Sequence, residues 1–423
     1  MRAKRTAVGE PSVYTGAMPA TTPSAPPARL PRPHVPLSPV LSLASFGAPR
    51  QGEPSGVLTA GPARLVTSGR IAIANALQEM GIGAGHKVLV PAYHSLSMIP
   101  PVLACGATPV FYKVGHDAAV NLDDMAARLE PSVRAVMVTN YFGMPQALER
   151  VRAFCDLHGL LMLEDCAHCF FGEHAGRPVG SWGDYAIASS MKFFPIYEGG
   201  CLVSAHHALR AAPPHSAGLG FEAKAGLNAL ETSFMWGRLA PLHALCWLPL
   251  RLKDALRRQA AKGTNGANGA TSREALAPSS SNSSVEFDPR WLDKRSSWFS
   301  RMVLRRASHA RIVALRRAHY LHLQQALAGL PGCRPLFAQL PAQACPWMFP
   351  LWVDDPEPLF ARLLAGGVPV TRFAQSLWPG VDESVCANSV ALSRQVLAFP
   401  CHQELHADEL AWLAAAIRAA LLA

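Results

Sequence analysis

Short apolar runs alternate with segments of helical period between about residues 66 and 204. Runs such as VMVTNYF and LLMLED are apolar without period-two alternation, which is typical of strands covered on both faces, as in a mostly parallel sheet. The strands expected from such runs are 87–91, 108–114, 135–141, 160–164, 185–189 and 201–204. The helices expected between them are 70–80, 97–104, 122–129 and 148–158. This alternation predicts an α/β fold with a mostly parallel, seven-stranded sheet, which binds its ligand beyond the carboxyl ends of the strands.

Low-complexity sequence interrupts this pattern twice and suggests the domain boundaries. Ten prolines fall within the first 50 residues, so residues 1–55 are expected to form a flexible tail. A Gly-, Asn- and Ser-rich stretch at 262–285 predicts an exposed linker. The large domain is then expected over residues 56–287, including the linker and a helical insert at 205–261. A smaller α+β domain is expected over 288–423, with helices at 307–327 and 408–422 and a short strand at 348–353.

Composition predicts a folded protein with a large core, since half of the 423 residues are hydrophobic and 16% are charged. The net charge of +10 is concentrated in residues 1–50 and 251–320, which is thin support for a nucleic-acid partner, and none is expected. The ten cysteines are scattered and suggest a reducing compartment. The longest apolar stretch, 239–250, is too short for a membrane span, and no signal-peptide run follows the basic N-terminus. A cytoplasmic location is therefore expected.

Three features bear on chemistry, and two of them lie at the ends of expected strands. Asp165 ends one strand, Lys192 follows another, and Ser68-Gly69-Arg70 opens a helix with small residues. The start of a helix with a glycine-rich entry is a ready phosphate site. A phosphate site, a strand-end acid and a lysine are the parts that pyridoxal 5'-phosphate (PLP) requires, because the acid keeps the pyridine nitrogen protonated and the lysine binds the aldehyde.

Four motifs then make the chain resemble the DegT/StrS group of PLP-dependent sugar aminotransferases, which have fold type I. They are SGRIAIANALQEMGIGAGHKVLVPAY, GATPVFYKV, LLMLEDCAHCFFGEHAGRPVGSWGD, and Lys192 with EGG beginning six positions later. The resemblance is close over about residues 60–205. It is loose in the C-terminal domain, where LAFPCHQEL is similar to the family's lPxHxxL.

The resemblance implies a role for each matching residue. Lys192 would be the catalytic lysine that forms an imine with the PLP aldehyde, and Asp165 would pair with the pyridinium nitrogen. The backbone amides at Ser68, Gly69 and Arg70 would hold the phosphate. Ser189 matches the family's phosphate-binding serine, if the loop before the lysine is two residues shorter here.

The chain departs from the family pattern at three positions. His168 stands where the family has a glutamine near the ring hydroxyl, and it is expected to contact the cofactor there. Arg70 replaces a phosphate-binding threonine. Ser95 stands in the place of an aromatic ring that stacks on the cofactor, so His94 or Tyr93 would stack instead, or no ring does. These departures leave PLP binding expected and leave the reaction and substrate open.

The same residues also have simpler interpretations. Taken alone, Asp165 would be a capping or ion-paired acid, Lys192 a solvated lysine and His168 a hydrogen-bonded core histidine. Cys166 and Cys169 flank His168 and could suggest zinc, but no second cysteine pair lies at a suitable spacing. Apolar packing is the better explanation for both thiols, and no metal site is expected.

The insert contains a segment, residues 236–262, that is rich in apolar residues and ends in the basic run RLKDALRRQAAK. A basic amphipathic helix of this kind can lie on an anionic membrane surface. It can equally pack on its own protein with its arginines in water. Packing is favoured, and a weak membrane contact is left open.

The family resemblance implies a homodimer whose active site is completed by the partner subunit. The implied reaction moves an amino group from an amino acid, with glutamate preferred, to the keto group of a nucleotide-linked sugar in polysaccharide or secondary-metabolite biosynthesis. One alternative is a PLP enzyme of the same fold that dehydrates a sugar or acts on a non-sugar ketone. The other is a non-catalytic regulatory or binding protein that kept the fold.

Overall fold

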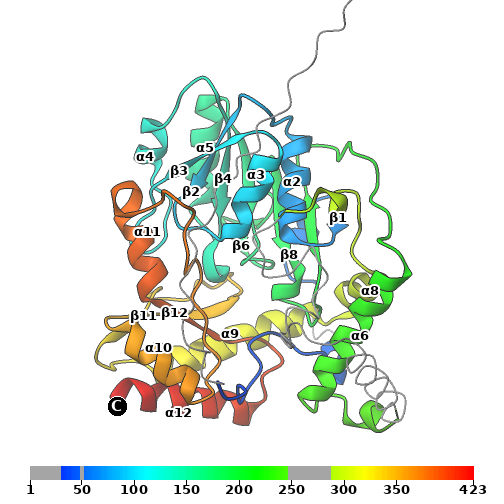
Figure 1. The fold of residues 1–423 in the computed structure, drawn as a ribbon, viewed down its shortest axis with the longest axis vertical. Helices are drawn as coiled ribbons and strands as arrows, with labels where there is room; N and C mark the ends of the chain where they lie inside the picture. The colour runs from blue at the N-terminus through cyan, green and yellow to red at the C-terminus, as the bar shows by residue number, and fades with distance from the viewer. Residues whose placement is uncertain (1–29, 48–51, 246–286) are drawn as a thin grey trace, which may run out of the picture.

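The computed structural model of the chain describes residues 30–47, 52–245 and 287–423. Its large domain is built on a sheet of seven strands, and helices lie against this sheet (Figure 1). Strand β9 is antiparallel to its two neighbours, and all other adjacent pairs are parallel. The predicted α/β fold with a mostly parallel seven-stranded sheet is therefore confirmed. In spatial order the strands are β1 (Ala63–Val66), β9 (Gly200–Val203), β8 (Tyr185–Ser189), β5 (Leu161–Asp165), β4 (Val133–Thr139), β2 (Lys87–Pro91) and β3 (Thr108–Tyr112).

Helices cover both faces of this sheet, which explains why its strands lack alternation. In β4, Ala135 and Met137 belong to the apolar core on the side of α2 and α3. Val136 and Val138 belong to the core on the opposite side, with residues of α4 and α5. Every second residue thus meets a different core, and both sets must be apolar. The helices are α2 (Gly69–Glu79), α3 (Ile99–Ala104), α4 (Leu122–Ala127) and α5 (Leu148–His158).

The six predicted strands and four predicted helices of this domain are confirmed, with most ends shifted by no more than two residues. Strand β1 was missed. It is only four residues long and contains Arg64, whose guanidinium is nearly buried and pairs with Glu79 at 2.9 Å. A charged residue inside so short a run hides the strand pattern. Smaller elements here are α1 (Val57–Ala60) and the hairpin of β6 (Glu173–His174) and β7 (Arg177–Pro178).

The C-terminal part contains a three-stranded antiparallel sheet with a core of its own. The strand predicted at 348–353 and the final helix are confirmed. The helix predicted at 307–327 begins at residue 309, because Ser308 caps it by accepting a hydrogen bond from the Arg311 backbone N–H. The elements are α8 (Trp298–Arg306), α9 (His309–Ala326), β10 (Cys333–Pro335), β11 (Met348–Val353), α10 (Pro356–Ala365), α11 (Glu383–Gln395), β12 (Val396–Pro400) and α12 (Ala407–Leu422).

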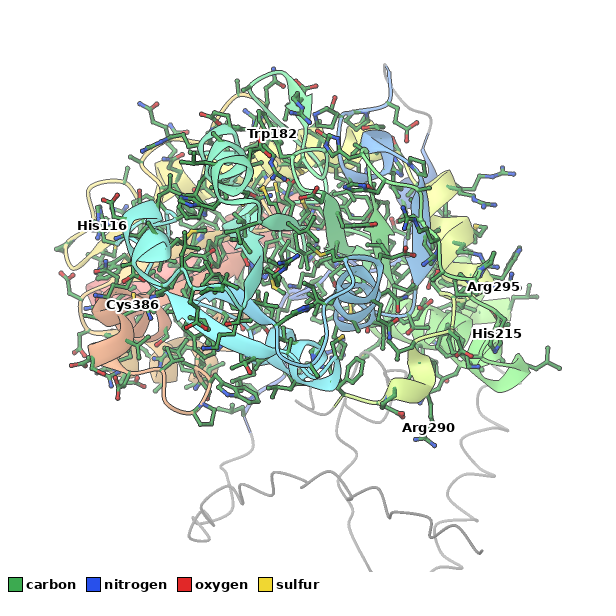
Figure 2. The ribbon with its side chains drawn as sticks, turned by 90° about the horizontal axis from the view of Figure 1, so that it is seen from above. His116, Trp182, His215, Arg290, Arg295 and Cys386 are labelled. Carbon is green, nitrogen blue, oxygen red and sulfur yellow. The ribbon has the colours of Figure 1, made fainter. Side chains whose placement is uncertain are left out.

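The insert expected at 205–261 is partly visible. Residues 219–235 form helix α6 (Leu219–Met235), which packs against α8. His215, Arg290 and Arg295 lie at the same end of the molecule (Figure 2). The basic run that ends segment 236–262, where packing is favoured over a weak membrane contact, and the linker expected at 262–285 lie outside the described residues. Among the helices that are described, none is long and apolar enough to cross a membrane.

The prediction of a flexible tail over residues 1–55 is wrong for the described segment 30–47. Val35 and Leu41 are buried in apolar cores, and the Pro36 carbonyl lies 3.0 Å from His402 Nε2. The hydroxyls of Ser42 and Ser45 donate to the Glu404 carboxylate at 2.7 and 3.1 Å. The high proline content predicted a flexible segment and gave no sign of these contacts. A few buried apolar side chains and hydrogen bonds to one buried acid are enough to order a short segment.

Candidate active site

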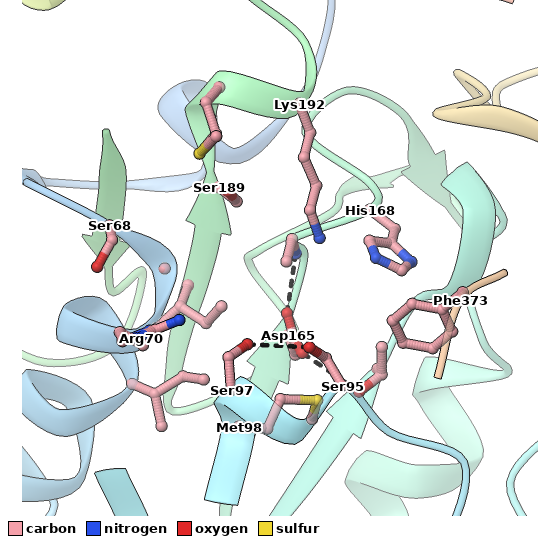
Figure 3. A pocket seen from close by; sticks show the side chains of 16 residues that line it. Ser68, Arg70, Ser95, Ser97, Met98, Asp165, His168, Ser189, Lys192 and Phe373 are labelled. Carbon is pink, nitrogen blue, oxygen red and sulfur yellow. Dashed lines mark hydrogen bonds between the residues drawn. The ribbon is translucent and has the colours of Figure 1, made fainter. Parts of the chain in front are cut away.

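A cavity of about 190 Å³ lies where strands β4, β5 and β8 end and helix α2 begins (Figure 3). Seven of the eight residues singled out by the sequence line it, namely Ser68, Gly69, Arg70, Asp165, His168, Ser189 and Lys192. This is the edge expected for a ligand, because the carboxyl ends of parallel strands meet there.

The start of α2 forms one wall. The Ser68 hydroxyl caps the helix by accepting a hydrogen bond from the Ile71 backbone N–H at 3.4 Å. The first backbone N–H groups of a helix have no partner inside it, so those of Gly69 and Arg70 are suited to an anion in the cavity. Burial lowers the pKa of the half-buried Arg70, whose guanidinium nevertheless keeps its charge at neutral pH. This wall can therefore hold a phosphate.

The two glycines of the EGG sequence, Gly199 and Gly200, allow strand β9 to lie close to the start of α2. Gly199 has a φ of +125° and donates its N–H to the Thr67 carbonyl at 2.7 Å. A Cβ on Gly200 would lie 2.5 Å from the carbonyl carbon and oxygen of Ser68. Only glycine allows strand β9 to run this close to the turn that leads into α2.

Asp165 lies at the end of β5 with 2% of its surface exposed. Its carboxylate accepts hydrogen bonds from the Ala167 backbone N–H at 2.9 Å and from the Thr139 hydroxyl at 3.3 Å. Burial raises the pKa of this carboxyl, while these hydrogen bonds and the Lys192 charge oppose the rise. A buried carboxylate of this kind stabilises a cation held opposite it.

Lys192 ends a short 3-10 turn (Ser190–Lys192) after β8, and its side chain points across the cavity toward Asp165 (Figure 3). Burial lowers the pKa of its amine to about 8, and the Asp165 charge limits the decrease. Because more of such an amine is unprotonated near neutral pH, it can attack a carbonyl carbon or accept a proton.

His168 forms the wall opposite α2 and is held by aromatic rings. Its ring stacks on Trp347 with centroids 3.9 Å apart and meets the edge of Phe373 at 4.5 Å. Burial and the Lys192 charge hold the pKa of His168 well below its usual range, so its imidazole is neutral. Its buried Nδ1 has no hydrogen-bond partner among the described residues.

His94 is the one predicted site residue that the structure places elsewhere, since it is absent from the described residues that line the cavity. Its Nδ1 lies 3.0 Å from the Ala92 carbonyl, and its Nε2 accepts the Trp378 backbone N–H at 3.0 Å. The ring stacks on Phe111. Of the alternatives that the sequence left open (His94, Tyr93 or no stacking ring), the position of His94 disfavours the first, because its ring is buried and hydrogen-bonds to Trp378 of the C-terminal domain.

The residues that the sequence predictions missed include Thr139 and Phe373, which line the cavity, and Trp347, which stacks on His168. Thr139 follows from the strand-end rule, because β4 is the neighbour of β5. Phe373 and Trp347 come from loops of the C-terminal domain, more than 180 residues along the chain from Asp165, and no local pattern marks them. They supply aromatic surface near the ligand position, whereas Ser95, in the place of the family's stacking ring, offers a hydroxyl that pairs with Ser97 at 2.9 Å.

Comparison with known proteins identifies relatives of the large domain. GDP-perosamine synthase of Vibrio cholerae is 32% identical over 145 residues, which cover 34% of this chain and 40% of that protein. The UDP-N-acetyl-3-dehydro-alpha-D-glucosamine 3-aminotransferase of Acidithiobacillus ferrooxidans is 34% identical over 129 residues, covering 30% and 34%. The chain thus spans less than half the length of the curated relatives that it matches.

Solved structures extend the similarity to both domains at the level of the fold. DesV of S. venezuelae, in complex with a ketimine intermediate, superposes with a TM-score of 0.57 at 21% identity, covering 85% of this chain and 84% of that one. The PLP form of the putative sugar aminotransferase Spr1654 from Streptococcus pneumoniae gives 0.61 at 15% identity, covering 92% and 98%. The fold is therefore that of PLP fold type I aminotransferases. Residues 59–229 match the DegT/DnrJ/EryC1/StrS aminotransferase family, which confirms the resemblance found in the sequence.

Proposed function

We propose that this protein is a PLP-dependent aminotransferase that moves an amino group from an amino acid, with glutamate as the first candidate, to a keto group of a nucleotide-linked sugar. The observation that carries the proposal is the convergence of Lys192, Asp165 and the start of α2 on one cavity. The relatives of the large domain are named as sugar aminotransferases and a perosamine synthase, which supports the sugar as acceptor.

The residues present fit PLP in chemistry and placement. The start of α2 offers backbone N–H groups and the Arg70 cation to a phosphate, at one wall of the cavity. Asp165 offers a buried carboxylate to a protonated ring nitrogen. The orphaned Nδ1 of His168 offers a neutral donor or acceptor to a ligand. This is the set of contacts that a phosphorylated pyridine aldehyde needs.

When bound, PLP supplies an electron-poor ring that stabilises negative charge on the carbon beside the transferred amine. Asp165 would hold the proton on the ring nitrogen. Lys192 would bind the aldehyde carbon and, once released by the incoming amine, move the proton from the substrate carbon. His168, backed by the Trp347 ring, and Phe373 bound this space and would exclude water from it. The second half-reaction, with the keto sugar, uses the same residues in reverse.

The proposal is tested by detecting a covalent link between PLP and Lys192. The purified chain is expected to take up PLP with a visible absorption band, and borohydride is expected to fix the label on a single peptide that contains Lys192. Lys192→Ala is expected to lose the band and to lower turnover by about 100-fold or more. Lys224→Ala, at an exposed lysine of α6, is the matched control and is expected to keep both.

A panel of keto sugars with glutamate as donor tests the substrate. Amine formation on a nucleotide-linked sugar supports the proposal. A labelled Lys192 with no turnover on any sugar would contradict it and favour sugar dehydration or a non-sugar ketone. A chain that takes up no PLP, and whose biological role survives Lys192→Ala, would instead be a binding protein that kept the fold.

The proposal includes a homodimer in the cytoplasm, with an active site completed by the partner subunit, and a division into a large domain over residues 56–287 and a smaller one over 288–423. Sedimentation of the purified chain, combined with mixing of two inactive variants from different walls of the site, tests the dimer. Restored activity in the mixture is expected if the partner completes each site, and a monomer with full activity would contradict it.

A further inference from the structure

Arg316 is a buried cation that the proposed chemistry does not use. It lies on α9 with none of its surface exposed. Its Nε donates to Gln403 Oε1 at 2.9 Å, Nη1 donates to the Pro346 and Trp347 carbonyls, and Nη2 donates to the Lys192 and Phe193 carbonyls. All five N–H groups of the guanidinium are thus used, and every acceptor is neutral.

This is a costly way to fill a core position. A buried charge whose hydrogen-bond acceptors are all neutral loses its hydration, and an apolar side chain of similar size would avoid that loss. What an apolar side chain could not do is bridge carbonyls from two separate loops. Only the planar fork of arginine donates in several fixed directions at once.

The two loops that Arg316 joins are those that carry Lys192 and Trp347. Nη2 lies 2.8 Å from the Lys192 carbonyl oxygen, and Nη1 lies 2.9 Å from that of Trp347. The side chains of the same two residues meet again in the site, where Lys192 Nζ lies 4.7 Å from the centre of the Trp347 ring. Lys192 and Trp347 are therefore linked twice, through Arg316 at their main chains and by direct contact of their side chains.

Gln403, the glutamine of the LAFPCHQEL motif, binds both Arg316 and the main chain next to Lys192, which gives this position of the motif a structural role. Its Oε1 accepts from Arg316 Nε, and its Nε2 donates to the Phe193 carbonyl at 2.9 Å. One side chain thus orients the guanidinium and also holds the residue that follows Lys192. The guanidinium in turn lies over the Phe193 ring, 4.4 Å from its centre.

We propose that Arg316, oriented by Gln403, is a positioning residue that locks the main chain of Lys192 to that of Trp347 and so fixes the direction of the Lys192 amine. It joins the C-terminal domain to the lysine of the large domain. The inference rests on the proposed role of Lys192, but its first test needs no cofactor.

The first experiment measures Lys192 in the cofactor-free full chain, by reductive methylation at a series of pH values and mass spectrometry of each lysine. In the wild type, labelling of Lys192 is expected to be half-maximal near pH 8. In Arg316→Met the midpoint is expected to move toward the ordinary value of 10.5, because the released lysine reaches water. Arg316→Lys is expected to behave as the methionine variant, since one ammonium cannot span both loops.

Arg317→Met is the matched control. Arg317 is the neighbouring residue on α9 and donates to the Pro341 and Ala344 carbonyls, on the same loop as Trp347, without reaching Lys192. Its loss disturbs that loop alone, so the Lys192 midpoint is expected to stay at the wild-type value. An equal shift in both variants would overturn the proposal, because it would mean general loosening.

The second experiment uses the PLP-loaded enzyme. Arg316→Met is expected to lower kcat by about 100-fold, the size expected from misplacing a reacting group by 1 Å, with KM for the amino acid changed less than threefold. If Arg316→Met does not fold, Gln403→Ala replaces it, with a smaller shift in the same direction. A folded variant of either kind with the wild-type midpoint and kcat would overturn the proposal. A wild type that binds no PLP would refute the proposed function, while the cofactor-free midpoints would still decide this inference.

Discussion

The candidate site is made of ionisable side chains held in states that water would not favour. Burial lowers the pKa of Lys192 to about 8, raises that of Asp165 and keeps His168 neutral. Desolvation is the largest cause in each case, since it penalises the charged form of acids and bases alike. Groups shifted in this way and gathered in one cavity are typical of a functional site.

Glu198, beside the cavity wall, gives a prediction for the dependence of stability on pH. Burial raises the pKa of its carboxyl from 4.5 to about 7, against hydrogen bonds from Ser297 to its Oε1. Between these two values the folded chain holds a proton that the unfolded chain has lost. The contribution of Glu198 to the free energy of unfolding must therefore fall as the pH rises from about 4.5 to 7.

The test compares how the free energy of unfolding depends on pH in the wild type and in Glu198→Gln. Glu198→Gln cannot titrate but can still accept the Ser297 hydrogen bonds. Relative to this variant, the wild type is expected to lose on the order of 1 to 3 kcal/mol of unfolding free energy between pH 5 and 8. Urea unfolding of both cofactor-free proteins across this range measures the difference, and a flat difference would show that Glu198 titrates normally.

At the scale of elements, the site depends on how closely β9 approaches the start of α2. The helix start can serve a phosphate only if it faces the strand ends that carry Asp165 and Lys192. Gly200 permits this, since its missing side chain leaves room for the Ser68 carbonyl. A turn, a helix start and a neighbouring strand are thus one structural unit.

Gly200→Ala tests this unit. The added methyl group would collide with main-chain atoms that cannot rotate away, so the start of α2 must shift. We expect about 1–3 kcal/mol of lost stability and a weaker affinity for PLP, measured by urea unfolding and by cofactor titration. Gly220→Ala is the control, because nothing lies within 4 Å of its added methyl group in helix α6. Unchanged PLP affinity in Gly200→Ala would contradict the assignment of α2 as the phosphate site.

At the scale of the whole molecule, the segment 30–47 packs against the C-terminal domain and hydrogen-bonds to its loop at residues 402–404. Glu404 is 3% exposed and receives hydrogen bonds from Ser42, Ser45 and Arg311. It follows Gln403, which holds Arg316, so the same short loop meets the N-terminal segment and the lysine that we propose as catalytic. Residues 403 and 404 thus connect the segment 30–47 to Arg316 and to the main chain next to Lys192.

The double variant Ser42→Ala/Ser45→Ala tests this connection. It removes two donors from a buried carboxylate, and a buried acceptor left without its partner costs about 1–3 kcal/mol. We expect the unfolding free energy to fall by that amount. Leu43→Ala is the control on the same turn, since Leu43 is 74% exposed, and it is expected to be neutral. Equal stability of the double variant and the wild type would mean that the hydrogen bonds from Ser42 and Ser45 to Glu404 contribute nothing to the free energy of unfolding.

The local sequence determined the sheet, its covering helices and the edge on which Lys192, Asp165 and Ser68 meet, because strand and helix periods and the strand-end rule depend on neighbours in the chain. Only the tertiary structure decided that His94 is turned away, that Trp347 and Phe373 enclose His168, and that residues 30–47 are packed. Each of these depends on a contact between segments far apart in the chain, where burial and hydrogen-bond partners, rather than local pattern, set the free energy.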